Sequence, residues 1–174
     1  PINTLPSAPR TNLGFRCSKD SVTHLTWGNE VLVEYRRSQP WLVDLLKDDP
    51  VRPELPKEFR VGKNKFVSVL VDDIPRAMVC VSLHDFIPED VNDLIKDTEV
   101  PNAAIFYTIW SYAPGAGVEL LRATVAEIQK QFPSIERFVT LSPKTEMAKK
   151  FHTKNGAGVY RENLNTVNYE YEVK

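Results

Sequence analysis

The segment 113–117 (APGAG) has the residue types that could bind an anionic ligand. Its glycines let the backbone approach a ligand closely, and a helix starting directly after them points unpaired N–H groups at negative charge. We therefore treat it as a candidate cradle for phosphate or pyrophosphate, with a purely geometric tight turn as the alternative. The segment is not a nucleotide P-loop, because it has no full GxGxxG pattern and no Lys-Ser/Thr pair follows it.

His152 is the candidate for proton transfer, because an imidazole titrates near neutral pH. By itself, a surface or capping role explains it more simply, and its interest depends on its neighbours. We expect His24 and His84 to be structural, because neither has a comparable context. Cys17 and Cys80 are too few for a disulfide framework or a zinc site, so we expect no metal.

Three elements must position these residues. The run 103–110 (AAIFYTIW) is typical of a strand covered on both faces. After the glycine turn, apolar residues at steps of three and four predict an amphipathic helix over 118–132, which Pro133 ends. The segment 135–141 (IERFVTL) predicts a second buried strand. Strand, helix and strand together indicate a right-handed crossover between parallel strands.

The N-terminal part of the chain gives weaker signals. We expect an extended arm over 1–23 and a single domain over 24–174, with a short edge strand or a loop at 22–27. A broken helical pattern predicts two short helices within 30–47, meeting at Pro40. The proline-rich and acidic segment 48–58 indicates a solvated connector.

The remaining segments alternate between strands and helices. An antiparallel hairpin is expected over 66–83, and a helix starts at 87–90. Thr145 can cap a helix over 146–154, which Asn155-Gly156 ends, and closing strands are expected at 158–161 and 166–173.

Composition excludes several classes of protein. A formal charge of −1 gives no electrostatic reason to expect nucleic acid as a partner. No apolar run is long enough to span a membrane, and no signal peptide is visible, so we expect a cytoplasmic protein.

The order of elements predicts an α/β (α+β) fold with a mixed central sheet flanked by helices. It resembles the acyl-CoA N-acyltransferase (GNAT) fold, in which a diverging strand and the next helix receive the pantetheine and pyrophosphate of coenzyme A. Fold resemblance alone does not establish function.

A set of spaced motifs resembles the catalytic domain of malonyl-CoA decarboxylase. The motifs are AAIFY at 103–107, GVEL at 117–120, EIQKQFP at 127–133, LSP at 141–143, FHTKNGA at 151–157 and NYEY at 168–171. The resemblance covers about residues 24–174 and implies removal of CO₂ from malonyl-CoA or a related malonyl thioester. The family's N-terminal helical domain and its long helical insertion after LSP are absent here, so the chain resembles a minimal version.

The resemblance also implies roles for particular residues. His152 matches the family's proton donor, which fits a reaction that leaves an enolate needing a proton and hydrogen-bond donors. The family pattern I-F-Y-S-I-S places a catalytic serine where this chain has Thr108 and Trp110, with Ser111 one step later, so either Thr108 or Ser111 supplies the hydroxyl. The residues expected to contact coenzyme A are Trp110, Tyr112, Ala113, Gly115, Ala116, Gly117, Val118, Asn155 and Tyr169.

Two other functions remain open from the sequence. An N-acetyltransferase on the same scaffold would use Tyr107 or Tyr160 as its acid or base, and a non-catalytic acyl-CoA-binding module would keep only the cradle. No cofactor is expected beyond the coenzyme A thioester. The acyl group could equally be carried by an acyl carrier protein, because both carriers present the same pantetheine arm.

Overall fold

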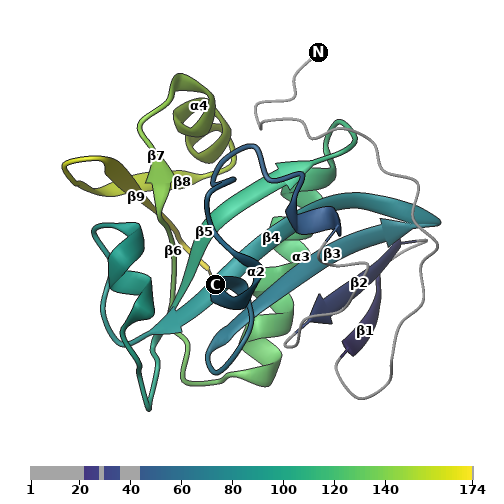
Figure 1. Cartoon of the computed structure of the whole chain (residues 1–174), viewed down its shortest axis with the longest axis horizontal. Helices are drawn as coiled ribbons and strands as arrows, with labels where there is room; N and C mark the ends of the chain where they lie inside the picture. The colour runs from purple at the N-terminus through teal and green to yellow at the C-terminus, as the bar shows by residue number, and fades with distance from the viewer. Residues whose placement is uncertain (1–21, 28–29, 36–43, 174) are drawn as a thin grey trace.

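The computed structural model describes residues 22–27, 30–35 and 44–173. Within them a mixed sheet runs in the order β1-β2-β3-β4-β5-β6-β9-β7, with β8 paired to β9 (Figure 1). The strands are β1 (Val22–Trp27), β2 (Glu30–Tyr35), β3 (Lys65–Asp72), β4 (Ile74–His84), β5 (Ala103–Ser111), β6 (Arg137–Thr140), β7 (Ser142–Pro143), β8 (Ala157–Glu162) and β9 (Thr166–Tyr171). The helices are α2 (Lys57–Arg60), the 3₁₀ helix η1 (Val91–Ile95), α3 (Ala116–Gln131) and α4 (Glu146–Lys154).

The sheet separates two hydrophobic clusters. On one face, alternate residues of β3, β4 and β5 pack against α3 through side chains such as Phe106, Leu120 and Ile128. On the other face, Tyr107, Trp110 and Leu141 pack against Leu45, and Phe59 of α2 packs at the edge of this cluster. In Figure 1, α3 lies behind the sheet and α2 in front of it.

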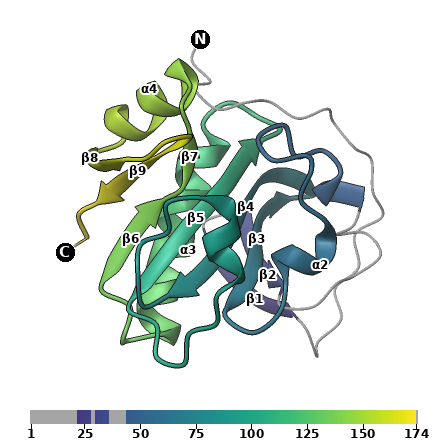
Figure 2. The ribbon, with the colours of Figure 1, turned by 60° about the vertical axis from the view of Figure 1, so that its left-hand side comes forward.

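The crossover from β5 through α3 to β6 is parallel, as its sequence predicts. The hairpin β3–β4 and the closing hairpin β8–β9 are also confirmed. Thr145 caps α4 by accepting a hydrogen bond from the Ala148 amide at 3.2 Å. Figure 2 shows α4, β7, β8 and β9 gathered at one end of the sheet, beside the C-terminal ends of β5 and β6.

Three expectations for less regular segments are wrong, wholly or in part. Residues 30–35 form strand β2, paired with both β1 and β3, because backbone pairing outweighs a helical spacing that includes the β-branched Val31 and Val33. Residues 44–46, in the second of the two predicted helices, are helical. The segment 48–58 is a solvated connector only in part, since residues 50, 53, 54 and 56–58 are exposed but Asp49 and Arg52 are buried. The helix expected from 87–90 is only the 3₁₀ helix η1, which buries Leu94 but leaves Ile95 exposed.

The prediction of an N-terminal arm falls mostly on residues 1–21, outside the described part of the chain. The predicted helix boundary at Pro40 also lies outside the described residues. Strand β1 already begins at Val22, one residue before the expected end of the arm. The division into an arm and one domain stays a prediction.

Candidate active site

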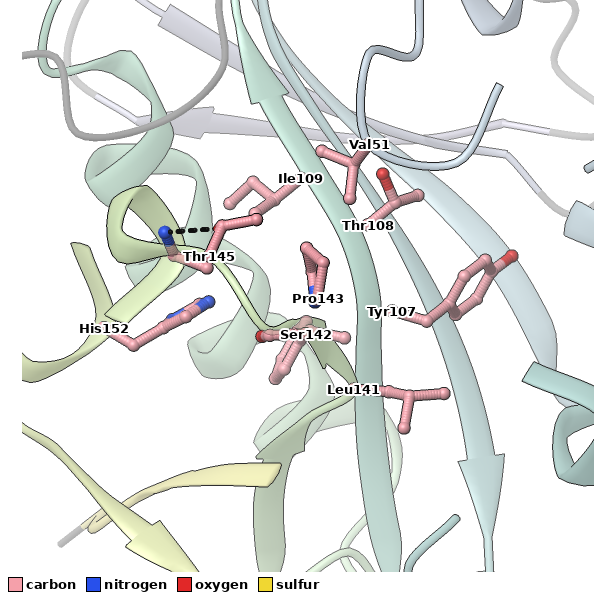
Figure 3. Close-up of a pocket in the computed structure, with 11 residues that line it drawn as sticks. Val51, Tyr107, Thr108, Ile109, Leu141, Ser142, Pro143, Thr145 and His152 are labelled. Carbon is pink, nitrogen blue, oxygen red and sulfur yellow. Dashed lines mark hydrogen bonds between the residues drawn. The ribbon is translucent and has the colours of Figure 1, made fainter. Parts of the chain in front are cut away.

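The candidate site lies where β5 and β6 part. Their parallel pairing runs from Ala103↔Arg137 to Phe106↔Thr140, and the Leu141 amide then donates to the Phe106 carbonyl at 2.9 Å. Beyond this point β5 continues to Ser111, whereas the chain after β6 turns to pair with β9 through β7. A cavity of about 40 Å³ opens between the diverging segments (Figure 3). It has room for a small acyl group and not for a whole coenzyme A molecule.

A β-bulge in β5 sets the orientation of its side chains at the cavity. The β4–β5 register pairs Cys80 with Thr108 but Val81 with Phe106, which leaves Tyr107 as an extra residue in β5. A bulge bends a strand and increases its local twist, so it favours divergence from the neighbour. In Figure 3, the Tyr107 ring points away from His152, on the opposite side of β5 from Ile109.

His152 lines this cavity from α4. The described residues that line it with His152 include Thr108, Ile109, Ser142, Pro143 and Thr145. The ring of His152 stacks on Tyr169 with centroids 5.1 Å apart, and its Nδ1 lies 2.7 Å from the Tyr171 hydroxyl. Burial lowers the pKa of His152 to about 3, so its imidazole is neutral at neutral pH.

His152 and Tyr171 share one hydrogen bond. Burial raises the pKa of Tyr171, so this phenol keeps its proton. The direction of the bond between the phenol and Nδ1 of His152 depends on the tautomer of the imidazole. In the tautomer that accepts from the phenol at Nδ1, the imidazole proton resides on Nε2, and Nε2–H is the donor that His152 offers to a ligand in the cavity.

The two candidate hydroxyls lie on opposite faces of β5. Thr108 lines the cavity, and its Oγ1 donates to Oδ1 of Asp49 at 2.9 Å. Ser111 lies three residues further along the strand, is buried against the α3 face, and is not among the residues that line the cavity. Thr108, and not Ser111, is thus among the residues that line the cavity, but its side chain lies on the side of β5 away from His152 (Figure 3).

A buried charge network supports Thr108 from below the sheet. Arg60 donates to Oδ2 of Asp49 at 2.6 Å, and the amides of Val51 and Arg52 donate to Oδ1 of Asp49. Arg52 and Arg60 are 8% and 1% exposed. The sequence analysis did not identify this network. The signal that could have indicated burial is the pair of apolar residues, Val51 and Leu55, among the charged residues of this proline-rich segment.

The glycine turn leads into α3 as expected. Gly115 is the N-cap residue of α3 in the left-handed region at φ 78°, and no side chain caps the helix start. Ala116, Gly117 and Val118 form the first turn; the Ala116 amide donates to the Ala113 carbonyl, and the amides of Gly117 and Val118 are left as donors for an anion. These residues follow the C-terminal end of β5, and none of them lines the cavity.

The remaining residues expected to contact coenzyme A are placed differently. Trp110 is fully buried, and its indole N–H donates to the hydroxyl of Tyr112, which in turn donates to Asp48. Any contact from Trp110 is therefore limited to its backbone. Asn155 caps the C-terminus of α4 by donating to the Phe151 carbonyl at 2.7 Å, and Tyr169 serves as the stacking partner of His152.

Within the described residues, no group of three or more His, Cys, Asp or Glu side chains could hold a metal ion. No helix in the same part of the chain is long and apolar enough to cross a membrane.

Solved structures show the class of fold. A GNAT-family acetyltransferase described as putative, from Desulfovibrio desulfuricans, superposes with a TM-score of 0.52 at 15% identity, covering 82% of this chain and 99% of that one. The N-acetyltransferase PseH of Campylobacter jejuni gives a TM-score of 0.55 at 8% identity, covering 83% and 99%. The described domain thus has the GNAT-like fold predicted from the order of its elements.

The family is narrower than the fold. Residues 51–170 match the malonyl-CoA decarboxylase C-terminal domain, and the chain belongs to this family. Malonyl-CoA decarboxylase from Agrobacterium vitis superposes with a TM-score of 0.72 at 17% identity, over 84% of this chain and 61% of that chain. The enzyme from Cupriavidus metallidurans gives 0.60 at 17% identity, over 87% and 60%. This chain thus spans about three fifths of either decarboxylase. A search of curated protein sequences found no match.

Proposed function

We propose that this chain decarboxylates malonyl-CoA, or a malonyl group on another pantetheine carrier, to the acetyl thioester. Membership of the malonyl-CoA decarboxylase C-terminal domain family supports this reaction. The observation that carries the assignment to this site is His152, a neutral histidine with Nε2 facing a small cavity where β5 and β6 part. The cavity takes the acyl end, while the start of α3 offers backbone donors to the pyrophosphate.

The reaction has two steps. The bond between the malonyl α-carbon and its carboxylate carbon breaks, CO₂ leaves, and the electron pair remains as a thioester enolate. The α-carbon then takes a proton from Nε2 of His152 while Tyr171 passes its proton to Nδ1, and water returns a proton to the phenolate, leaving hydroxide. The enolate carries the same charge of −1 as the malonyl carboxylate, and protonation removes it.

Thr108 is the hydroxyl we assign to the site. Its hydroxyl donates to Asp49 and lies on the side of β5 away from His152, so Thr108 supports the cavity wall and does not contact the imidazole. This arrangement fixes the rotamer of Thr108 in the wall of the cavity, where it positions the acyl group. Ser111 has no corresponding place in that wall.

The acetyltransferase alternative is less well supported by the geometry. The Tyr107 hydroxyl is buried on the opposite face of the sheet, where its ring packs edge-on against Phe59 at 6.1 Å. Tyr160 lies on β8 and is 46% exposed, outside the residues that line the cavity. Neither tyrosine is placed to serve an amine at the cavity.

Incubation of the purified chain with malonyl-CoA tests the proposal, with acetyl-CoA and CO₂ followed by mass spectrometry. We expect turnover by the wild type and a loss of about 100-fold or more in His152→Gln, the range for removing a general acid. His84→Gln is the matched control, because His84 is also buried with a lowered pKa but lies outside the cavity wall. Acetyl transfer to an amine, or coenzyme A binding without turnover, would contradict the assignment.

A further inference from the structure

Arg52 occupies the point at which the β5–β6 ladder stops. Its Nε donates to the Tyr107 carbonyl and its Nη2 donates to the Leu141 carbonyl, each at 2.9 Å. If the parallel ladder continued, the Leu141 carbonyl would accept an N–H from β5. The guanidinium takes that place and joins both strands across the gap.

The charge of Arg52 is only partly compensated by its neighbours. Asp49 forms its salt bridge with Arg60 at 2.6 Å, and within the described ranges no salt bridge includes Arg52. Burial has the largest effect on Arg52 and lowers its pKa, whereas the exposed Glu54 and the buried Asp49 favour its charged form electrostatically. Among the buried groups, two arginines and one aspartate leave an excess of one positive charge, because Arg side chains stay protonated.

The cavity adjoins this partly compensated charge. Both carbonyls that bind Arg52 belong to cavity-lining residues, Tyr107 and Leu141, and Val51 beside it also lines the cavity. None of the 11 described residues that line the cavity is Asp, Glu, Lys or Arg. Behind this wall lie Arg52 and the Asp49 carboxylate, and Asp49 is already bonded to Arg60 and Thr108, so Arg52 is the charge left to attract an anionic group.

We propose that Arg52 is the specificity-determining residue of this site, whose buried charge selects a thioester with an anionic acyl end. This inference rests on the proposed function, which places the acyl group of the substrate in the cavity. The malonyl carboxylate and the enolate left by CO₂ both carry −1, so Arg52 attracts substrate and intermediate alike. The acetyl product is neutral, loses this attraction, and leaves the cavity more readily.

Binding measurements in a His152→Gln background test the proposal, since malonyl-CoA is then not consumed. Acetoacetyl-CoA is the matched probe, because a neutral methyl ketone replaces the carboxylate at nearly the same size. We expect malonyl-CoA to bind about tenfold more tightly than acetoacetyl-CoA, the order of one partly screened charge interaction. Arg52→Lys should keep most of this preference, and Arg52→Met should abolish it with little change for acetoacetyl-CoA.

The control variant is Arg137→Met, which removes a salt bridge to Glu170 at the opposite end of β6 and should leave the preference unchanged. Equal losses for both ligands in Arg52→Met would mean that Arg52 only supports the fold and would overturn the proposal. If Arg52→Met does not fold, equal affinities of the chain with Arg52 for malonyl-CoA and acetoacetyl-CoA are sufficient to reject the proposal. If the chain prefers malonyl-CoA but the wild type does not decarboxylate it, the inference about Arg52 stands and the proposed function is rejected. If the wild type decarboxylates malonyl-CoA but the chain shows no preference for it, the proposed function stands and the inference about Arg52 is rejected.

Discussion

At the residue scale, the His152 imidazole is surrounded by aromatic rings. The rings of Phe151 and Tyr171 make T-shaped contacts with the imidazole, at centroid distances of 5.1 and 5.8 Å, and the Tyr169 ring stacks on the imidazole. These rings exclude water and lower the pKa of the imidazole, while the Tyr171 hydroxyl fixes its orientation. In the proposed mechanism, this neutral imidazole is the proton donor, and one phenol sets its direction.

Replacing Tyr171 by Phe tests this positioning role. Without the hydroxyl, Nδ1 has no fixed donor, both tautomers become accessible, and we expect kcat to fall by about 10- to 100-fold, as for loss of an orienting partner. KM for malonyl-CoA should change little, because the ring and its packing remain. The control is Tyr160→Phe on the exposed strand β8, which should retain wild-type kcat. A fall in KM and kcat by the same factor in Tyr171→Phe would argue against positioning.

Site candidates in short motifs could be named from the sequence, and candidates that depend on long-range contacts could not. His152 and Thr108 were named because their segments resemble motifs of malonyl-CoA decarboxylase, and their roles stay predictions. Arg52 could not be identified, because its partners at Tyr107 and Leu141 lie 55 and 89 positions away. The choice between Thr108 and Ser111 likewise required the bulge at Tyr107, which sequence periodicity does not reveal.

At the element scale, the start of α3 depends on one backbone conformation. Gly115 has φ 78°, and an added Cβ there would meet no atom within 4 Å, so any penalty for a side chain comes from the backbone alone. The sequence predicted this turn because glycine and proline are strong local signals. The sequence wrongly predicted a helix at β2, because pairing with β1 and β3 decides the conformation there.

Gly115→Ala is therefore expected to destabilise the fold by about 1 to 2 kcal/mol, the cost of a left-handed conformation for an L-residue. Shifting the first turn of α3 should also weaken coenzyme A binding. Gly158→Ala is the matched control, because Gly158 is equally open but does not have a positive φ. Urea unfolding and calorimetric titration with coenzyme A measure the two effects, and equal stabilities of the two variants would refute the role of the Gly115 backbone.

At the scale of the whole molecule, two buried histidines link stability to pH. Burial lowers the pKa of His152 to about 3 and that of His84 to about 4, from 6.5. Because the unfolded chain binds these protons more readily, each histidine contributes stability that is fully present above about pH 6.5. The contribution is lost as the pH falls from 6.5 toward 4 for His84 and toward 3 for His152.

Within this window, the free energy of unfolding should decrease by about 1 kcal/mol per pH unit for each histidine. Urea denaturation of the wild type at pH 7, 6 and 5 measures the slope, and His84→Gln or His152→Gln should each reduce it by about half. A wild-type slope unchanged in both variants would show that other groups cause the pH dependence.

The hydrogen bonds of Arg52 also have a consequence for the order in which the chain folds. Forming them requires the closure of loops of 55 and 89 residues, which is slower than the pairing of adjacent strands such as β3 and β4. The hairpin framework can therefore form early, while the gap between β5 and β6 gains its bridge only after Leu141 has been synthesised and docked. A growing or refolding chain can thus pair β3 with β4 before Arg52 bridges β5 and β6.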